Sequence, residues 1–268
     1  MSKPRRPARK PAKAAKDRAP IWARPAPGTR RPRLTREQIA EVALAIADHE
    51  GFEAVSMRRI AEDLGAGTMT LYHYMRTKND LLALMDDALM AEALVPANEM
   101  PDGWREGLAA IARRFRDVFM RHPWAMHALR GARLGPNGLR HVEQSMAAVS
   151  TAPIPDADKV ALCGVLDDFT FGCVLRSMEA MTVELLGDAR ALDKLVSAHI
   201  ATGELPFMAA FVGKDRPTAA FERAAAWMND DARFEFGIQA ILDAVGGPRR
   251  PTQAPAAPAP ARARKARR

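Results

Sequence analysis

The stretch from Ser56 to Met75 constrains the fold more than any other part of the sequence. It predicts two short helices, the first capped by Ser56 and the second running from Thr68 to about Met75. The turn between them is Gly65-Ala66-Gly67, in which Gly65 suits the left-handed backbone conformation that ends many helices. Two short helices around such a turn form a helix-turn-helix, and the second helix of this motif enters the major groove of DNA by its N-terminal half.

The side chains of the second helix divide into an inward and an outward set. Leu71 and Met75, four residues apart, are predicted to pack inward. The remaining side chains are predicted to face outward or sideways: Thr68, Met69, Thr70, Tyr72, His73 and Tyr74. Methyl groups can contact thymine methyls, whereas hydroxyls and imidazole can reach base edges or phosphates. Lys78 suits a phosphate, and Arg58 suits a base or the DNA backbone. On spacing alone, a helical hairpin with no role in DNA binding remains an alternative.

One helix precedes this pair and another follows it. Thr35 is predicted to cap the preceding helix, with Gln38 closing a capping box and Gly51 ending the helix. Its buried stripe recurs at helical spacing and consists of Ile39, Val42, Ala43, Ile46 and Ala47. Lys78-Asn79-Asp80 is predicted to interrupt the chain before a leucine-rich fourth helix.

The remainder of the chain also predicts helices, because no stretch alternates apolar and polar residues for long enough to indicate a sheet. The expected helices are 79–94, 102–121, 123–131, 136–150, 156–186, 190–201 and 231–245, with shorter helical pieces between 206 and 228. No apolar run reaches the roughly 18 residues of a membrane span, and no signal peptide is evident. We therefore expect an all-α, cytoplasmic protein.

The net charge of +8 is unevenly distributed along the chain. Residues 1–33 carry a net charge of +11 and residues 247–268 carry +7, so that residues 34–246 carry −10. Both ends are rich in Pro and Ala and are predicted to be disordered. They serve either solubility or DNA phosphates, where their affinity would fall with salt. Residues 34–81 hold five Lys and Arg against eight acids, so we expect the N-terminal arm to add to DNA affinity.

The sequence predicts no catalytic, cofactor or metal site. It shows no Gly-rich phosphate loop, no Cys and His spacing typical of a metal site, and no Ser, His and Asp set on one helical face. Asp167 and Asp168 are adjacent and diverge by about 100° on a helix, which makes them a poor catalytic pair. Cys163 and Cys173 lie ten residues apart on one expected helix, about 15 Å along its axis, which is too far for a disulfide.

Two groups of residues resemble a known family. The segments L-T-R-E-Q-I from Leu34 and S-M-R-R-I-A-E-D-L-G-A-G-T-M-T-L-Y-H-Y-M-R-T-K-N-D-L-L from Ser56 resemble the DNA-binding head of the TetR family of bacterial repressors. Residues from Trp104 to Glu179, and from Phe234 to Asp243, resemble the C-terminal domain of its tetracycline-repressor branch. The matching motifs are His122-Pro123, Leu134-Gly135-Pro136-Asn137, D-F-T-F-G-C-V-L from Asp168, and F-E-F-G from Phe234.

The resemblance implies an all-helical homodimer that binds two half-sites of a palindromic operator. It implies a helix-turn-helix head over 34–81 and a ligand-binding and dimerisation body over 82–246. The resemblance leaves outside it the disordered basic arm over 1–33 and the disordered basic tail over 247–268, which the composition predicts. Bases would be read by Arg58, Thr68, Met69, Thr70 and Tyr72, whereas His73, Tyr74 and Lys78 would hold phosphates.

Two helices of the body are expected to form the dimer as a four-helix bundle. The helix over 156–186 would contribute Val160, Ala161, Gly164, Val165, Asp168, Phe169, Gly172, Leu175 and Arg176. The last helix would contribute Phe234, Ile238, Ile241, Leu242 and Val245, and Gly164, Gly172 and Gly237 would permit close approach. Ordinary packing within one chain remains the alternative for these residues.

A small-molecule inducer is expected to bind in the body. Candidate lining residues, each of which could equally be plain core, are Phe115, Phe119, Trp124, Met126, His127, Leu129 and Phe169. Leu94 and Leu129 stand where the resemblance would place histidines for magnesium–tetracycline, so we expect a different, partly apolar ligand. Ligand would tilt the helix over 79–94 and release a repressor from DNA. A ligand-dependent activator and a non-specific DNA binder driven by the basic tails remain alternatives.

Overall fold

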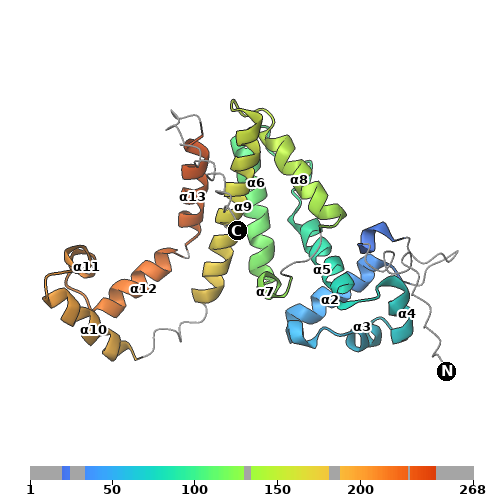
Figure 1. Cartoon of the computed structure of the whole chain (residues 1–268), viewed down its shortest axis with the longest axis horizontal. Coiled ribbons are helices and arrows are strands. Elements are labelled where there is room, and N and C mark those ends of the chain that lie inside the picture. The colour runs from blue at the N-terminus through green and yellow to red at the C-terminus, as the bar shows by residue number, and fades with distance from the viewer. Residues whose placement is uncertain (1–19, 25–33, 130–133, 181–187, 229, 246–268) are drawn as a thin grey trace, which may run out of the picture.

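Capping side chains set the start of α2, α3 and α5, the helices that begin at Arg36, Met57 and Lys78. The computed structural model describes residues 20–24, 34–129, 134–180, 188–228 and 230–245, and these residues are helical with no strand (Figure 1). The head helices are α2 (Arg36–Glu50), α3 (Met57–Asp63) and α4 (Thr68–Tyr74), with 3₁₀ turns η1 (Ile21–Ala23) and η2 (Phe52–Ala54). The body and its extension comprise α5 (Lys78–Ala93), α6 (Trp104–Arg121), α7 (Ala125–Ala128), α8 (Pro136–Val149), α9 (Asp156–Ala180), α10 (Ala189–Ala201), α11 (Pro206–Val212), α12 (Pro217–Met228) and α13 (Asp231–Asp243).

The predicted signals at the ends of the head helices are confirmed. Thr35 Oγ1 accepts a hydrogen bond from the Gln38 backbone N–H at 3.1 Å, and Gln38 Oε1 accepts one from the Thr35 N–H at 2.9 Å. The Ser56 hydroxyl accepts a bond from the Arg59 N–H at 3.2 Å. Gly65 adopts a φ of 59°, which an L side chain disfavours, and this turn allows α4 to fold back beside α3.

Two predicted helix boundaries are wrong. Lys78-Asn79-Asp80 does not interrupt the chain but forms the first turn of α5. Thr77 is the N-cap, and its side chain accepts from the Asp80 N–H at 3.1 Å, because Thr-x-x-Asp supplies a reciprocal cap. The predicted helix over 123–131 is only the four-residue α7, which ends at Ala128.

An N-terminal segment packs onto the head, which corrects the prediction that all of residues 1–33 are disordered. Ile21 is only 2% exposed and joins the head core. Arg24 forms an ion pair with Asp80, and Arg36 donates a hydrogen bond to the Arg24 carbonyl at 3.2 Å. The other residues of the predicted arm, and the predicted tail over 247–268, lie outside the described residues.

Two hydrophobic cores hold these helices together. The first runs without a break from the head into the lower body, because α2 and α4 share it with α5 and with Phe115, Phe119 and Val174. The second joins α6, α8, α9 and α13 and includes Ile238 and Leu242. Helix α5 packs against both α2 and α8, so it links the head to the body.

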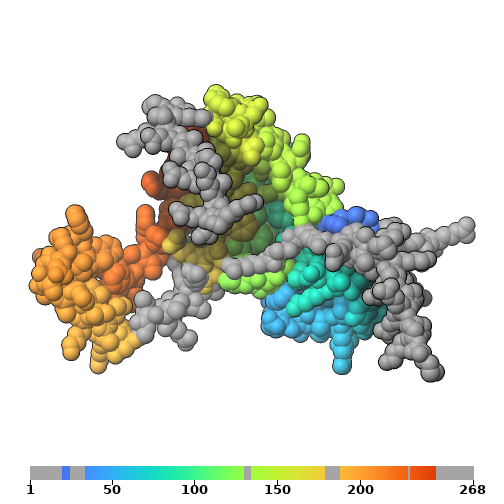
Figure 2. Space-filling view, viewed as in Figure 1, coloured from blue at the N-terminus to red at the C-terminus, as the bar shows by residue number. Residues whose placement is uncertain are grey.

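Helices α10, α11 and α12 stand apart from the main body in Figures 1 and 2. Asp193 fixes α10 to α12 by accepting hydrogen bonds from the backbone N–H and the hydroxyl of Thr218 at 2.7 and 3.1 Å. Within the described part of the chain, no helix combines the length and apolarity needed to cross a bilayer.

Candidate nucleic-acid interface

Helix α4 presents a set of exposed side chains beside α3. Met69 is 74% exposed, Tyr72 is 44% exposed and His73 is also exposed. Thr68 and Thr70 are half-buried at the start of the helix. Leu71 and Met75 are fully buried, as predicted, because one face of this short helix supports the head core.

Tyr74 does not face outward as predicted. It is only 8% exposed and belongs to the head core with Leu71 and Met75. The sequence pattern was ambiguous because Tyr74 lies one helical turn from Leu71, and i, i+3 residues share a helix face. The outward surface of α4 therefore carries two ring side chains, Tyr72 and His73, rather than three.

Arg58 and Lys78 lie on either side of this surface. Arg58 is largely exposed on α3 and pairs with Glu62 at 2.8 Å, one turn along the same helix. Lys78 begins α5, and its Nζ lies 5.6 Å from the centre of the Phe52 ring. Arg58 and Lys78 are both exposed, so a DNA phosphate would approach them from solvent. The exposed Arg58–Glu62 pair contributes little stability, so Arg58 would exchange Glu62 for a phosphate readily.

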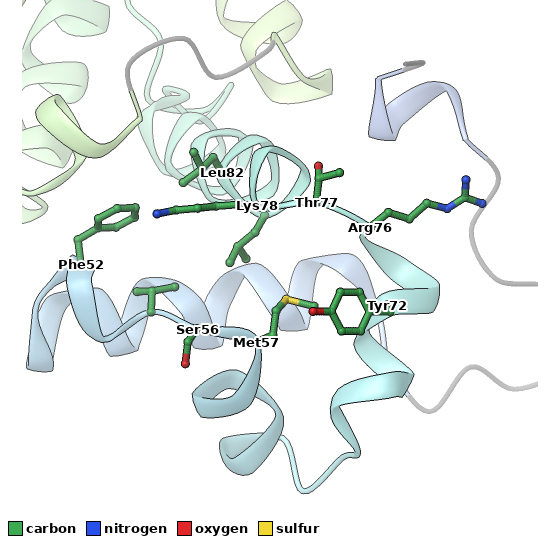
Figure 3. A pocket seen from close by; sticks show the side chains of 10 residues that line it. Phe52, Ser56, Met57, Tyr72, Arg76, Thr77, Lys78 and Leu82 are labelled. Atoms are coloured by element: carbon green, nitrogen blue, oxygen red, sulfur yellow. The ribbon is translucent and has the colours of Figure 1, made fainter. Parts of the chain in front are cut away.

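A cleft of about 330 Å³ separates the start of α3 from the α4–α5 junction. In Figure 3 the ring of Tyr72 points toward Met57, and Lys78 runs along the opposite wall toward Phe52. Ser56, Tyr72 and Thr77 also line the cleft. The cleft thus combines apolar walls with hydrogen-bond donors on the face of the head that carries the exposed side chains of α4.

Buried carboxylates stabilise the joints on either side of α5. Burial of Asp80 would raise the pKa of its carboxyl, but hydrogen bonds from Arg24 and from the backbone of Arg76 and Thr77 outweigh it, so the pKa is lowered. Asp80 Oδ2 accepts the Arg76 N–H at 2.8 Å, which fixes the end of the α4–α5 turn.

At the body side of α5, Asp87 caps the N-terminus of α8. Its Oδ1 accepts the Asn137 N–H at 2.7 Å, and its Oδ2 accepts the Asn137 side-chain amide at 2.9 Å. Burial nevertheless raises the pKa of Asp87. Burial, and next the neighbouring Asp87 charge, raise the pKa of Asp86 to about 6.

A contact between head and body escaped sequence analysis. Trp124 stacks on Phe52 of the head with ring centres 5.7 Å apart, and its Nε1 donates to Asp48 at 2.7 Å. His122 is buried and lies between Asp48 of α2, at 2.8 Å, and Glu92 of α5, at 3.4 Å. The run His122-Pro123-Trp124 indicates a helix end. No local pattern in it predicts a contact with Asp48, which lies 74 residues from His122.

The structure places the seven predicted ligand-binding residues in three different surroundings. Phe115, Phe119, Met126 and Leu129 are buried in the first core. Trp124 faces the head, and exposed His127 lines a surface hollow with it. Phe169 belongs to the second core, where it stacks on Phe234 at 5.7 Å.

An aromatic cluster in the body extends the predicted set. Phe115 stacks on Phe119 with centres 4.4 Å apart, and Phe171 meets the Phe115 ring edge-on at 4.8 Å. His141 lies 5.6 Å from Phe115, and burial lowers the pKa of its imidazole. Phe171 is partly exposed, so this cluster reaches the surface of the chain. Sequence analysis did not single out Phe171 or His141, whose place beside Phe115 depends on how α6, α8 and α9 pack.

The outer faces of α9 and α13 expose apolar residues. Val160 and Val165 of α9 are more than half exposed, and Phe236 of α13 is 69% exposed. The predicted stripe of α13 instead packs within the chain, with Phe234, Ile238 and Leu242 buried. A Cβ atom on Gly237 would clash with the edge of the Phe169 ring at its Cζ, so this glycine permits α9 and α13 to approach within one chain.

Cys163 and Cys173 are free thiols, in line with the prediction that they cannot pair. Among the residues that the structure describes, no group of three or more His, Cys, Asp and Glu is arranged to hold a metal ion.

Comparisons with known proteins agree with this arrangement. Residues 39–85 match the family of bacterial regulatory proteins named after tetR, and residues 95–246 match the tetracyclin repressor-like C-terminal domain. The chain is 33% identical over 229 residues to the HTH-type transcriptional repressor DrrR1 of Streptomyces coeruleorubidus, which covers 83% of this chain and 80% of that protein. It is 34% identical over 225 residues to an HTH-type transcriptional regulator of Saccharopolyspora erythraea, covering 83% and 89% of the two chains.

A solved structure extends the similarity to the fold. The TetR family protein ActR of Streptomyces coelicolor, in complex with (S)-DNPA, has a TM-score of 0.58 and 27% identity, covering 80% of this chain and 98% of ActR. The matching families are transcriptional regulators and not enzymes, in line with the prediction. With a helix-turn-helix head and a matching helical body, the chain belongs to the TetR family of bacterial transcriptional regulators.

Proposed function

We propose that the protein is a cytoplasmic repressor that binds a palindromic operator as a homodimer and leaves it when a small, partly apolar inducer binds. The observation that carries this proposal is the exposed surface of α4, with Met69, Tyr72 and His73 beside half-buried Thr68 and Thr70. These side chains offer methyl groups and hydrogen-bond donors to base edges. Arg58 would read a base, and Lys78 would hold a phosphate. Relatives described as repressors support this direction of regulation.

The homodimer is supported by the apolar outer face of α9 and α13. Val160, Val165 and Phe236 are exposed there, and a groove of about 500 Å³ lined by Ala161 and Ile241 lies between the two helices. Contiguous apolar patches on a soluble chain usually mark an interaction site. A two-fold axis would pair this face with itself, so that α9 and α13 of two copies form a four-helix bundle.

The inducer would bind near the aromatic cluster of Phe115, Phe119 and Phe171. A solved relative, ActR, has been described in complex with actinorhodin, which supports a small-molecule ligand for the body. Ligand there would shift α6 against α5 and so change the separation of the two α4 helices. Successive major grooves on one face of DNA lie about 34–36 Å apart, and a ligand that favours another separation must weaken DNA binding.

A footprint on the DNA beside the protein's own gene tests the proposal. The full chain should protect a palindrome, and the double substitution T70A/Y72A should abolish sequence-selective protection without loss of helical circular dichroism. The matched control is the double substitution L139A/V142A on the outer face of α8, which leaves His141 unchanged. Leu139 and Val142 are exposed on the body, so this variant should keep the footprint. Selective binding that survives T70A/Y72A would overturn the proposal.

Deletion of residues 1–19 together with residues 247–268 separates this function from binding driven by the basic tails. A specific repressor should keep its footprint with weaker overall affinity, whereas a non-specific binder should lose nearly all affinity. Transcription of the adjacent gene, measured with and without the protein, distinguishes repression from activation.

A further inference from the structure

The imidazole of His122 joins the body to the head at the end of α6. His122 is the C-cap of α6 and is only 7% exposed. Its Nδ1 lies 2.8 Å from Asp48 Oδ1 of α2, and its Nε2 lies 3.4 Å from Glu92 Oε2 of α5. The ring therefore has a carboxylate of the head on one side and a carboxylate of the linking helix α5 on the other.

Both carboxylates act as acceptors at this junction. Asp48 Oδ1 also accepts the indole N–H of Trp124 at 2.7 Å, and Glu92 Oε2 pairs with Arg121 at 3.0 Å. A further guanidinium belongs to Arg114, whose Nε donates to the Glu92 backbone carbonyl at 2.8 Å. An ionised carboxylate accepts hydrogen bonds and donates none, so each ring nitrogen must supply the proton for its own contact.

The number of protons on the ring decides how many of these contacts are hydrogen bonds. A neutral imidazole carries one N–H, whereas an imidazolium carries two. The neutral ring can donate to Asp48 or to Glu92, but not to both, and its other nitrogen then places a lone pair against a carboxylate oxygen. Because the distance to Asp48 is the shorter, the neutral ring keeps its proton on Nδ1 and loses the bond to Glu92.

We propose that His122 is a proton-dependent clamp between head and body. The neutral ring holds the end of α6 to Asp48 of the head, and a second proton adds a hydrogen bond to Glu92 of α5. Histidine suits such a switch because its side chain gains and loses a proton within the physiological range of pH. Acid then fastens the end of α6 to both α2 and α5. The clamp does not depend on the proposed repressor function, because its contacts lie within one chain.

A double-mutant cycle measured at two pH values tests the clamp on the full chain. H122N keeps an amide N–H near the position of Nδ1 and has no counterpart of Nε2, and E92M removes the carboxylate without adding a donor. The cycle therefore isolates the contact between Nε2 and Glu92. At about pH 5 the two substitutions should be coupled by about fivefold or more in the equilibrium constant for unfolding, and at about pH 8.5 by less than about twofold.

The matched control is H127N, at an exposed histidine of α7. This variant should show no coupling to E92M at either pH, because His127 makes no contact with Glu92 that could change with a proton. Coupling between H122N and E92M that is equal at the two pH values, or absent at both, overturns the proposal.

Nitrogen-15 magnetic resonance of the imidazole groups gives a second measurement on the unsubstituted chain, which applies even where H122N or E92M fails to fold. The chain has six histidines, and the His122 signals are assigned by elimination from single substitutions of the others. Nδ1 should carry a proton at both pH values, and Nε2 only at the lower one, since the hydrogen bond to Asp48 sets the tautomer. An Nε2 whose protonation does not change, or loss of the proton from Nδ1 instead, overturns the proposal.

Discussion

The indole of Trp124 donates a hydrogen bond to the carboxylate of Asp48 at 2.7 Å, and this bond joins the body to the head. The substitution W124F should keep most of the stacking on Phe52 but lose this bond to a charged acceptor. We expect the free energy of unfolding to fall by about 1–3 kcal/mol, measured by urea denaturation.

The matched control for this prediction is W227F, because Trp227 is 58% exposed. Its free energy of unfolding should change by no more than about 0.5 kcal/mol, as is usual at the surface. Equal losses in the two variants would show that the Trp124–Asp48 bond contributes nothing to stability.

Lys78 should act on DNA as a point charge. We expect K78A to weaken binding to specific and unrelated DNA alike, and to reduce by about one the slope of log affinity against log salt concentration. Fluorescence anisotropy of labelled duplexes over a range of salt measures both effects. K214A, which removes an exposed lysine between α11 and α12, should leave the slope unchanged; a slope that K78A does not alter would exclude a phosphate contact.

Phe236 should lie in the dimer interface. A charge introduced by F236E would occur twice across a two-fold axis and would be buried there, which is strongly unfavourable. We expect the variant to elute as a monomer in size-exclusion chromatography with light scattering, with the helical content of the wild type. L139E, at an exposed apolar position of α8, should remain dimeric. A dimeric F236E variant would place the interface elsewhere.

Asp86 should make stability depend on pH. Its folded-state pKa of about 6 lies above the ordinary value of 3.8, so between these values the unfolded chain binds fewer protons than the folded chain. Stability from this group is therefore present at low pH, falls as pH rises toward 6, and stays low above it. The variant D86N carries no charge, so its stability relative to the wild type should rise over this interval and then level off.

Urea denaturation at several pH values measures this difference. D102N, at an exposed aspartate, should show no such change with pH. A constant difference between D86N and the wild type from about pH 4 to pH 7 would contradict a raised pKa for Asp86.

Arg24 should anchor the N-terminal segment through Asp80. Both side chains are largely buried, and R24A would leave Asp80 with only its backbone N–H donors and its Thr77 cap. We expect a loss of about 1–3 kcal/mol in unfolding free energy near pH 7. Because the folded-state pKa of Asp80 is lowered, this contribution should disappear as pH falls through that pKa. R216A, at an exposed arginine, is the control.

Local signals in the sequence were sufficient to predict the head. Thr35 with Gln38, Ser56, and Gly65 act within a few residues of their own position, so their effects can be recognised without knowing the tertiary structure. The same holds for Leu71 and Met75, whose spacing placed them in the core. Tyr74 could not be assigned this way, because a tyrosine on the flank of a short helix suits either the core or the surface.

The sequence alone determined the helices, the turn that orients α4, and the polar face that this helix presents. Capping, helical periodicity and glycine conformation are local properties, so these features need no knowledge of the tertiary structure. The tertiary structure decided which distant groups meet: Trp124 with Asp48, Arg24 with Asp80, and His122 with Glu92. These contacts depend on how helices far apart in the chain pack, and packing free energy is summed over many side chains, so no short motif encodes it.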